Sequence, residues 1–145
     1  MKALIQRVKS ASVSIDGQIY SQINKGLLIF LGVEKDDTTP NADWLVSKIL
    51  KLRIFEDDNE KMNLSVSDIC GEILVVSQFT LAGDCKKGTR PSFDNAKPPQ
   101  EANELYEYFV SELKKSPLNI QTGVFRAMMD ISLINDGPVT FMLEH

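Results

Sequence analysis

The chain has 145 residues, of which 43% are hydrophobic, so it is long enough for one domain with a buried core. Its 20 acidic residues outnumber its 16 lysines and arginines, which argues against a broad nucleic-acid-binding face, whereas a short single-stranded end with few phosphates is compatible with this charge. No apolar run reaches about 18 residues and charges interrupt the first residues, so we expect neither a membrane span nor a secretory signal.

The first third of the chain is predicted to form strands. Residues 3–8 form the first strand, and residues 12–15 alternate apolar and polar side chains with the period of a half-buried strand. Asp16-Gly17 is a strong hairpin signal before a return strand at 18–21. The continuous apolar run at 27–33 predicts a strand that is covered on both faces.

The middle of the chain predicts a first helix. Thr39-Pro40 is a suitable start, because proline is favoured in the first helical turn. The residues that follow place an apolar side toward the core, with Lys48 as the polar exception. The apolar members are Trp44, Leu45, Ile49 and Leu52. The acidic segment 57–60 is expected to form a turn.

A second helix is expected at about 100–115, after a polar loop at 82–99 that is long enough to suggest a functional role. The apolar stripe of this helix consists of Leu105, Tyr106, Phe109, Val110 and Leu113. Further strands are predicted at 63–66, 72–79, 120–125, 129–134 and 139–143. This order predicts an α/β fold in which residues 1–145 form a single compact domain, with a mixed, strongly curved, barrel-like sheet covered by two helices.

Residues that commonly carry hydrolytic chemistry are scarce. The only histidine, His145, is the last residue, where chains usually fray, so we do not expect a Ser-His-Asp arrangement. One histidine and two cysteines, Cys70 and Cys85, cannot supply a typical zinc site, and no phosphate loop or dinucleotide-binding motif is present. We therefore expect no metal and no cofactor, and we interpret the cysteines as free thiols of a cytoplasmic protein.

Two polar segments remain as candidate sites. Ser77-Gln78-Phe79-Thr80-Leu81 ends an apolar strand with hydroxyl and amide side chains, where exposed backbone N–H groups could hold an oxyanion. A strand that runs into a Ser/Thr turn explains this composition equally well. Asn135-Asp136-Gly137-Pro138-Val139-Thr140 has the composition of a simple hairpin turn between two strands.

Taken together, the two segments resemble motifs of the D-aminoacyl-tRNA deacylase family, historically called D-tyrosyl-tRNA deacylase. The resemblance extends along the whole chain and includes residues 4–8, 26–34, 53–55, 61–64 and 88–93. Two motifs at matching distance within a full-length resemblance are far more specific than either motif alone.

The resemblance implies an aminoacyl-tRNA ester hydrolase of translation quality control, which acts on a D-amino acid, or on glycine, esterified to the 3′ end of tRNA. It implies a homodimer with both active sites at the interface. In this arrangement Gly137-Pro138 is a cis pair that enters the pocket of the other subunit, and Arg7 helps to hold it. Ser77, Gln78, Phe79 and Thr80 would line the same pocket.

Backbone atoms can read chirality in such a pocket. The carbonyl group of Gly137 can accept the substrate ammonium while rigid backbone blocks the direction of an L side chain, and glycine, which has no side chain, escapes this rejection. Two hypotheses for cleavage stay open. In the first, the Thr80 hydroxyl is the nucleophile or positions a water molecule. In the second, backbone N–H groups near Phe79 and Thr80 stabilise the oxyanion and the ribose 2′-OH assists; the lack of an internal base favours this second hypothesis.

The long loop carries four cations and two acids, which are equally well explained as contacts for acceptor-stem phosphates and as a solvated loop. The cations are Lys86, Lys87, Arg90 and Lys97, and the acids are Asp84 and Asp94. Two rival functions remain. One is a non-catalytic dimeric module that binds free D-amino acids or small peptides. The other is a metal-dependent hydrolase, which the cysteine and histidine counts disfavour.

Overall fold

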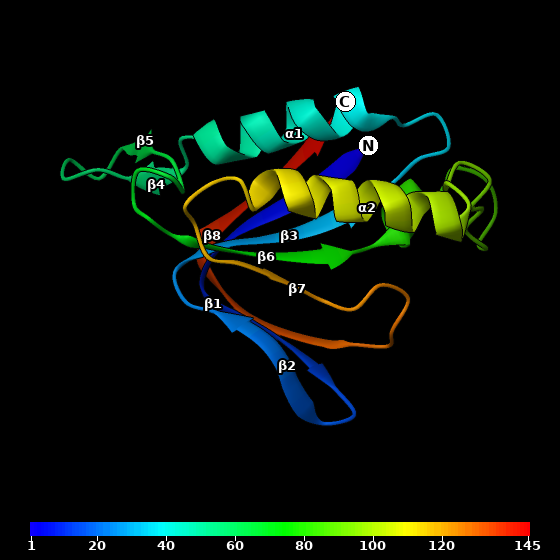
Figure 1. Cartoon of the computed structure of the whole chain (residues 1–145), viewed down its shortest axis with the longest axis horizontal. Helices are drawn as coiled ribbons and strands as arrows, with labels where there is room; N and C mark the ends of the chain where they lie inside the picture. Colours follow the sequence, from blue (N-terminus) through cyan, green and yellow to red (C-terminus); the bar gives the residue numbers. More distant parts are fainter.

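Six strands form one mixed, bent sheet, and two helices lie side by side across one of its faces (Figure 1). The computed structural model describes residues 1–145. The sheet consists of β1 (Lys2–Ile15), β2 (Gln18–Ile23), β3 (Gly26–Gly32), β6 (Glu72–Ser77), β7 (Ile120–Thr122) and β8 (Asp130–Glu144). The other elements are α1 (Thr39–Lys51), α2 (Pro99–Leu113), a hairpin of β4 (Phe55–Glu56) and β5 (Met62–Leu64), and the 3-10 helix η1 (Phe79–Ala82).

The long strand β1 gives the sheet its curvature. Its first half pairs antiparallel with β3, and its second half pairs antiparallel with β2. On its other side β8 follows it antiparallel from end to end, with irregularities of register between Gln6 and Ser10. Such bulges bend a strand and increase its twist. The two halves of β1 therefore belong to different parts of a sheet that turns back on itself, as the lower part of Figure 1 shows.

The strands β6 and β7 extend the sheet until its edge comes near β2, so that the sheet is nearly closed into a barrel. β6 pairs parallel with β3, and β7 pairs parallel with β6. The hydroxyl of Ser21 on β2 then donates a hydrogen bond to the carbonyl oxygen of Thr122 on β7, at 2.8 Å. The expected α/β fold, with a mixed, barrel-like sheet covered by two helices, is confirmed.

Two apolar cores hold this arrangement. The larger lies between the helices and the sheet and contains Leu45, Phe55 and Phe109, each 1% exposed or less. The smaller fills the curl of the sheet. The buried hydroxyl of Tyr106 on α2 donates to the carbonyl oxygen of Val75, at 2.9 Å, and burial raises the pKa of this phenol well above its usual value. Neither helix has the length and hydrophobicity needed to cross a membrane.

The structure corrects several predicted boundaries. The strands predicted at 129–134 and 139–143 are one strand, β8, so residues 136–138 do not form a hairpin turn. The predicted strand at 72–79 ends at Ser77, and the one at 120–125 ends at Thr122. Likewise, the segments at 3–8 and 12–15 are two halves of β1. The Asp16-Gly17 hairpin is confirmed, since both residues have positive φ.

The apolar side of α1 also differs from the prediction. Trp44 is 38% exposed, whereas Ala42, Leu45, Val46 and Ile49 are the buried residues of this helix. The ring of Trp44 instead stacks on that of His145, with ring centroids 4.4 Å apart. A contact from the end of the chain therefore replaces burial in the core.

Candidate functional site

The two predicted motifs lie at opposite ends of β3. Arg7, which contacts the Gly137 motif, pairs with Leu27, whereas Ser77 pairs with Leu31. Four residues along a strand correspond to roughly 13 Å at about 3.3 Å per residue. Each motif borders a cleft of its own, and neither of these two clefts contains both motifs.

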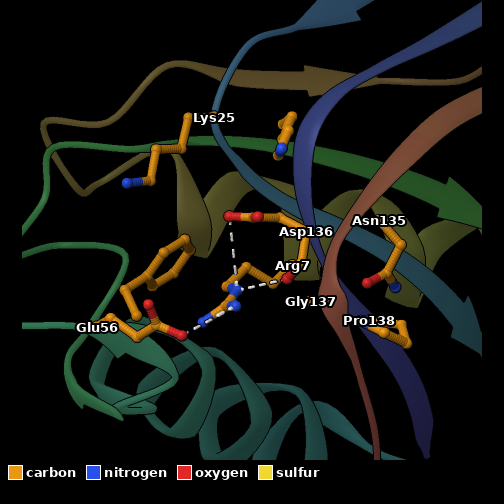
Figure 2. A pocket seen from close by; sticks show the side chains of 9 residues that line it. Arg7, Lys25, Glu56, Asn135, Asp136, Gly137 and Pro138 are labelled. Atoms are coloured by element: carbon orange, nitrogen blue, oxygen red, sulfur yellow. Dashed lines mark hydrogen bonds and ion pairs between the residues drawn. The ribbon is translucent and has the colours of Figure 1, made fainter. Parts of the chain in front are cut away.

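Arg7 is the anchor of the first cleft, which we call the arginine cleft; its volume is about 550 Å³ (Figure 2). Its residues are Arg7, Lys9, Lys25, Phe55, Glu56 and residues 135–138. The Arg7 residue is only 5% exposed. Its Nε donates to the carbonyl oxygen of Asp136 and its Nη1 to that of Ile54, each at 2.7 Å. Arg7 therefore ties the bend of β8 to the segment that leads into β4.

Two carboxylates balance the charge of this guanidinium. Figure 2 shows the side chains of Asp136 and Glu56 directed toward Arg7 from different sides. The ion-pair distances are 3.7 Å to Asp136 and 3.6 Å to Glu56. Planar guanidinium donors hold several acceptors in fixed directions. Arg7 thus contacts this segment of β8 through both the carbonyl oxygen and the carboxylate of Asp136.

Gly137 and Pro138 lie exposed at the rim of the arginine cleft and are joined by a cis peptide bond. The φ of Gly137 is +151°, a value that L side chains rarely adopt. A methyl group at this position would lie 2.6 Å from Cγ2 and 2.8 Å from the backbone nitrogen of Val139. The backbone here therefore requires glycine.

Asn135 is a structural residue of this motif to which the sequence analysis assigned no role. Its Oδ1 accepts a hydrogen bond from the Val139 backbone N–H at 2.6 Å, and its Nδ2 donates to the Val139 carbonyl oxygen at 3.2 Å. The same amide donates to Thr140 Oγ1 at 3.1 Å. One side chain thus spans the irregular part of β8 and fixes Gly137-Pro138 between its two ends. The clue in the sequence was an Asx residue before a turn-like segment.

The second cleft begins where β6 ends, and we call it the strand-end cleft; its volume is about 670 Å³. Ser77, Gln78 and Phe79 form one wall, and most of the other lining residues are apolar. The other walls come from residues 93–102 and 125–131. The ring of Phe79 is exposed and packs at 5.1 Å from that of Phe93. This site can take an apolar or aromatic group beside a row of polar atoms.

Thr80 does not itself line the strand-end cleft but is bound to a residue that does. The side-chain amide of Gln78 donates to Thr80 Oγ1 at 2.5 Å. No histidine, lysine or carboxylate makes a hydrogen bond to this hydroxyl within the chain, so the partner seen for it is an amide and not a base.

Free backbone donors mark the same place. Phe79 and Thr80 open the 3-10 helix η1, and their N–H groups donate to no acceptor within the chain, whereas the neighbouring N–H of Gln78 donates to the Leu31 carbonyl oxygen. Two adjacent free N–H groups can stabilise a negatively charged oxygen.

Other candidate groups lie outside both clefts. His145 is ordered: its ring stacks on that of Trp44, and its backbone N–H donates a hydrogen bond to the Met1 carbonyl oxygen. Cys70 and Cys85 are both exposed and free. No three side chains of the His, Cys, Asp or Glu type are grouped so that they could hold a metal ion.

The sequence model of the family described as D-Tyr-tRNA(Tyr) deacylase matches residues 4–144, and the chain belongs to this family. It is 60% identical over 144 residues to a protein of Geotalea daltonii named D-aminoacyl-tRNA deacylase, a match that covers 99% of this chain and 96% of the relative. The resemblance described from the two motifs is thereby confirmed.

Solved structures agree with the fold. A structure described as c-Myc DNA Unwinding Element Binding Protein superposes with a TM-score of 0.95 at 43% identity, covering 100% of this chain and 99% of the other. A probable eukaryotic D-amino acid tRNA deacylase superposes with a TM-score of 0.84 and covers 98% of this chain and 97% of the other. At 16% identity, the second likeness concerns the fold alone.

Proposed function

We propose that this chain hydrolyses the ester bond of D-aminoacyl-tRNA in the cytoplasm and releases the D-amino acid and free tRNA. The observation that carries this proposal is the family match over residues 4–144, which makes the chain an aminoacyl-tRNA ester hydrolase. The strand-end cleft supports it, because free N–H groups and polar side chains border an apolar space there. Aminoacyl esters are activated already, so a histidine base is not required.

The complete site is proposed to form between two copies of the chain. Gly137 and Pro138 are exposed, and in one chain they lie at the opposite end of β3 from Ser77. In a twofold dimer each subunit offers its motif to the strand-end cleft of the other, and both sites are equivalent. β8 also exposes apolar side chains that an interface would cover: Ile134 (57%), Phe141 (41%) and Met142 (44%).

Chiral selection in this proposal is steric. The Gly137 carbonyl accepts the ammonium of the substrate, and the backbone of Gly137-Pro138, fixed by Arg7 and Asn135, occupies the direction that an L side chain would take. A D side chain points into open space. Glycine cannot be excluded by a clash, so the same site also removes glycine from mischarged tRNA.

The cleavage step is proposed to rely on the backbone. The N–H groups of Phe79 and Thr80 stabilise the oxyanion that forms when the ester carbonyl is attacked, and the terminal ribose 2′-OH of the tRNA assists. In the alternative, Thr80 is the nucleophile or positions water. The hydrogen bond from Gln78 to Thr80 without a basic partner favours the backbone mechanism. A substrate with a 2′-deoxy terminal adenosine is expected to react slowly, and a normal rate would exclude the assistance.

The decisive experiment is hydrolysis of matched D- and L-aminoacyl-tRNA by the purified protein, with glycyl-tRNA as a third substrate and EDTA throughout. We expect release of the D-amino acid and glycine, and retention of the L ester. Binding of free D-amino acids without hydrolysis would support the rival binding module, and loss of activity in EDTA would support the rival metal-dependent hydrolase. Equal hydrolysis of the D and L esters would exclude the chiral filter.

A further inference from the structure

The strand-end cleft is lined by two charged residues, and both are positive. They are Lys97, which precedes α2 in the sequence, and Arg126, which follows it. No acidic residue lines this cleft, although acids outnumber bases in the chain by 20 to 16. The charge of the cleft is therefore opposite to that of the whole molecule, as expected for a site that receives an anionic group.

Arg126 has no partner for its charge. Its guanidinium forms no ion pair and no hydrogen bond within the chain, although 20 acidic residues are available. Its φ is +62°, in the left-handed region, where glycine is favoured and other residues are uncommon. The residue lies in the turn at 125–126, which the hydrogen bond from the Ala127 N–H to the Val124 carbonyl oxygen closes. A long cationic side chain is thus presented at the cleft from a backbone position that glycine would suit better.

Lys97 is a cation held in a fixed place. Its side chain is only 10% exposed, and its Nζ donates to the Lys35 carbonyl oxygen at 2.7 Å. The nearest carboxylate, that of Glu101, is 62% exposed and lies at 3.9 Å, a weak contact in water. Because its stem is already ordered, this ammonium loses little conformational freedom when it binds an anion.

We propose that Arg126 and Lys97 bind a phosphate of the single-stranded 3′ end of the RNA and thereby position the terminal ester in the strand-end cleft. This inference rests on the proposed function, in which the substrate enters this cleft with its terminal nucleotide. The phosphate of that nucleotide is the charge nearest to the ester. Guanidinium groups contact phosphate oxygens through two parallel hydrogen bonds, and a lysine adds a point charge. A site with two cations also reconciles an acidic protein with an RNA substrate, because few phosphates are touched.

The test compares a substrate that has phosphates with one that has none. Single-turnover hydrolysis of D-aminoacyl-tRNA and of D-aminoacyl-adenosine is measured for Arg126→Gln and Lys97→Gln. On the tRNA we expect each variant to raise the half-saturating concentration about tenfold, with the maximal rate retained. We expect no change on the adenosine ester. The dependence of tRNA binding on salt should also weaken, by a slope of about 0.7 per phosphate contact.

Three further variants sharpen the result. Lys114→Gln removes the same charge from the far end of α2, roughly 20 Å from the cleft at about 1.5 Å per residue, and is expected to behave as wild type. Arg126→Lys should recover part of the binding. Arg126→Gly removes the side chain and suits the left-handed backbone, so its unfolding temperature should be unchanged or higher while tRNA binding falls.

Several outcomes would overturn the proposal. Equal loss on both substrates would mean that the two cations act on the ester and not on a phosphate. A loss for Lys114→Gln as large as that for Arg126→Gln would indicate a general charge effect. A changed oligomeric state of Arg126→Gln would assign the residue to an interface. If the wild type hydrolyses neither substrate, the proposed function fails, and this inference fails with it.

Discussion

At the scale of single residues, the backbone N–H of Phe79 can be removed without removing the helix that it opens. Proline is tolerated at the first helical position, where the N–H has no partner within the helix. We expect Phe79→Pro to slow single-turnover hydrolysis of D-aminoacyl-tRNA by about 100- to 1000-fold, the usual cost of losing one oxyanion donor. Phe79→Ala is the matched control, because it removes the ring and keeps the N–H. Similar rates for the two variants would exclude the oxyanion role.

Thr80 separates the two hypotheses for cleavage. If backbone donors and the ribose 2′-OH carry the reaction, Thr80→Ala should lower the single-turnover rate by no more than about tenfold, roughly the effect of one lost hydrogen bond. Thr80→Ser keeps the hydroxyl that accepts from Gln78 and should match the wild type. A loss of several orders of magnitude in Thr80→Ala alone would make the hydroxyl a direct participant.

At the scale of elements, the β4–β5 hairpin supports the wall against which Arg7 packs, and its turn depends on one carboxylate. Hydrogen bonds lower the pKa of Asp57; the largest effect comes from the Asn63 side chain, followed by the Lys61 and Asn59 backbone N–H groups. A pKa lowered by folding stabilises the protein above the unfolded pKa of about 4, and this contribution is lost as the pH falls through the folded pKa.

The variant Asp57→Asn should therefore unfold at a lower temperature than the wild type at pH 7, and the difference should shrink as the pH is lowered below about 4. Thermal unfolding at pH 7 and at about pH 3 measures this difference. Asp58→Asn is the control, because the neighbouring carboxylate makes no hydrogen bond within the chain. A deficit for Asp57→Asn that is the same at both pH values would contradict the assignment.

The elements also show how far sequence patterns reach. The pattern of apolar residues predicts both helices and the buried strands β3 and β6, because in these elements burial follows from the order of neighbouring residues in the sequence. The same reasoning wrongly predicts two strands in place of β8, separated at Asp136-Gly137-Pro138, because the local composition there is that of a turn. The chain stays extended since β1 offers 14 residues to pair with, and the irregularity becomes a bulge. A distant strand thus overrides local turn chemistry, and the sequence around the motif does not contain this information.

Side-chain roles show the same limit. Arg7, Gly137 and Pro138 line one cleft, and their proposed role stays a prediction. The parts played by Asn135 and the Ile54 carbonyl are found only through the structure, since their partners lie across an irregular stretch or 47 residues away. Lys97 is one of the four loop cations singled out in the sequence, whereas Arg126 belongs to no motif. What joins them is a shared cleft that forms only when the loop after β7 meets the segment before α2.

At the scale of the whole molecule, the proposed dimer predicts that two inactive variants restore one another. Phe79→Pro damages the strand-end cleft, and Gly137→Ala forces the motif to shift, because its methyl group would meet Val139 at 2.6 Å. In a mixed dimer one site combines both defects and the other has neither. Random exchange gives half mixed dimers, so coexpression should recover about a quarter of the wild-type activity.

The control is a mixture of the two separately purified variants, measured before their subunits exchange. Light scattering checks that each variant keeps the oligomeric state of the wild type. Coexpressed proteins no more active than their separate parents would mean that each site is complete within one chain. Such a result would leave ester hydrolysis itself unaffected as a proposal, since it addresses only where the two motifs meet.

The contact between Ser21 and Thr122 has a consequence for motion. Every other neighbouring pair of strands in the main sheet is joined by a ladder of backbone hydrogen bonds, whereas β2 and β7 meet through this side-chain bond. The sheet is therefore a nearly closed ring with one weak seam, and local opening takes place where the fewest bonds must break. The segment that leaves β7 continues into the wall of the strand-end cleft. Opening of this seam would free the start of that segment, so the wall of the cleft is attached to the sheet at its least strongly bonded joint.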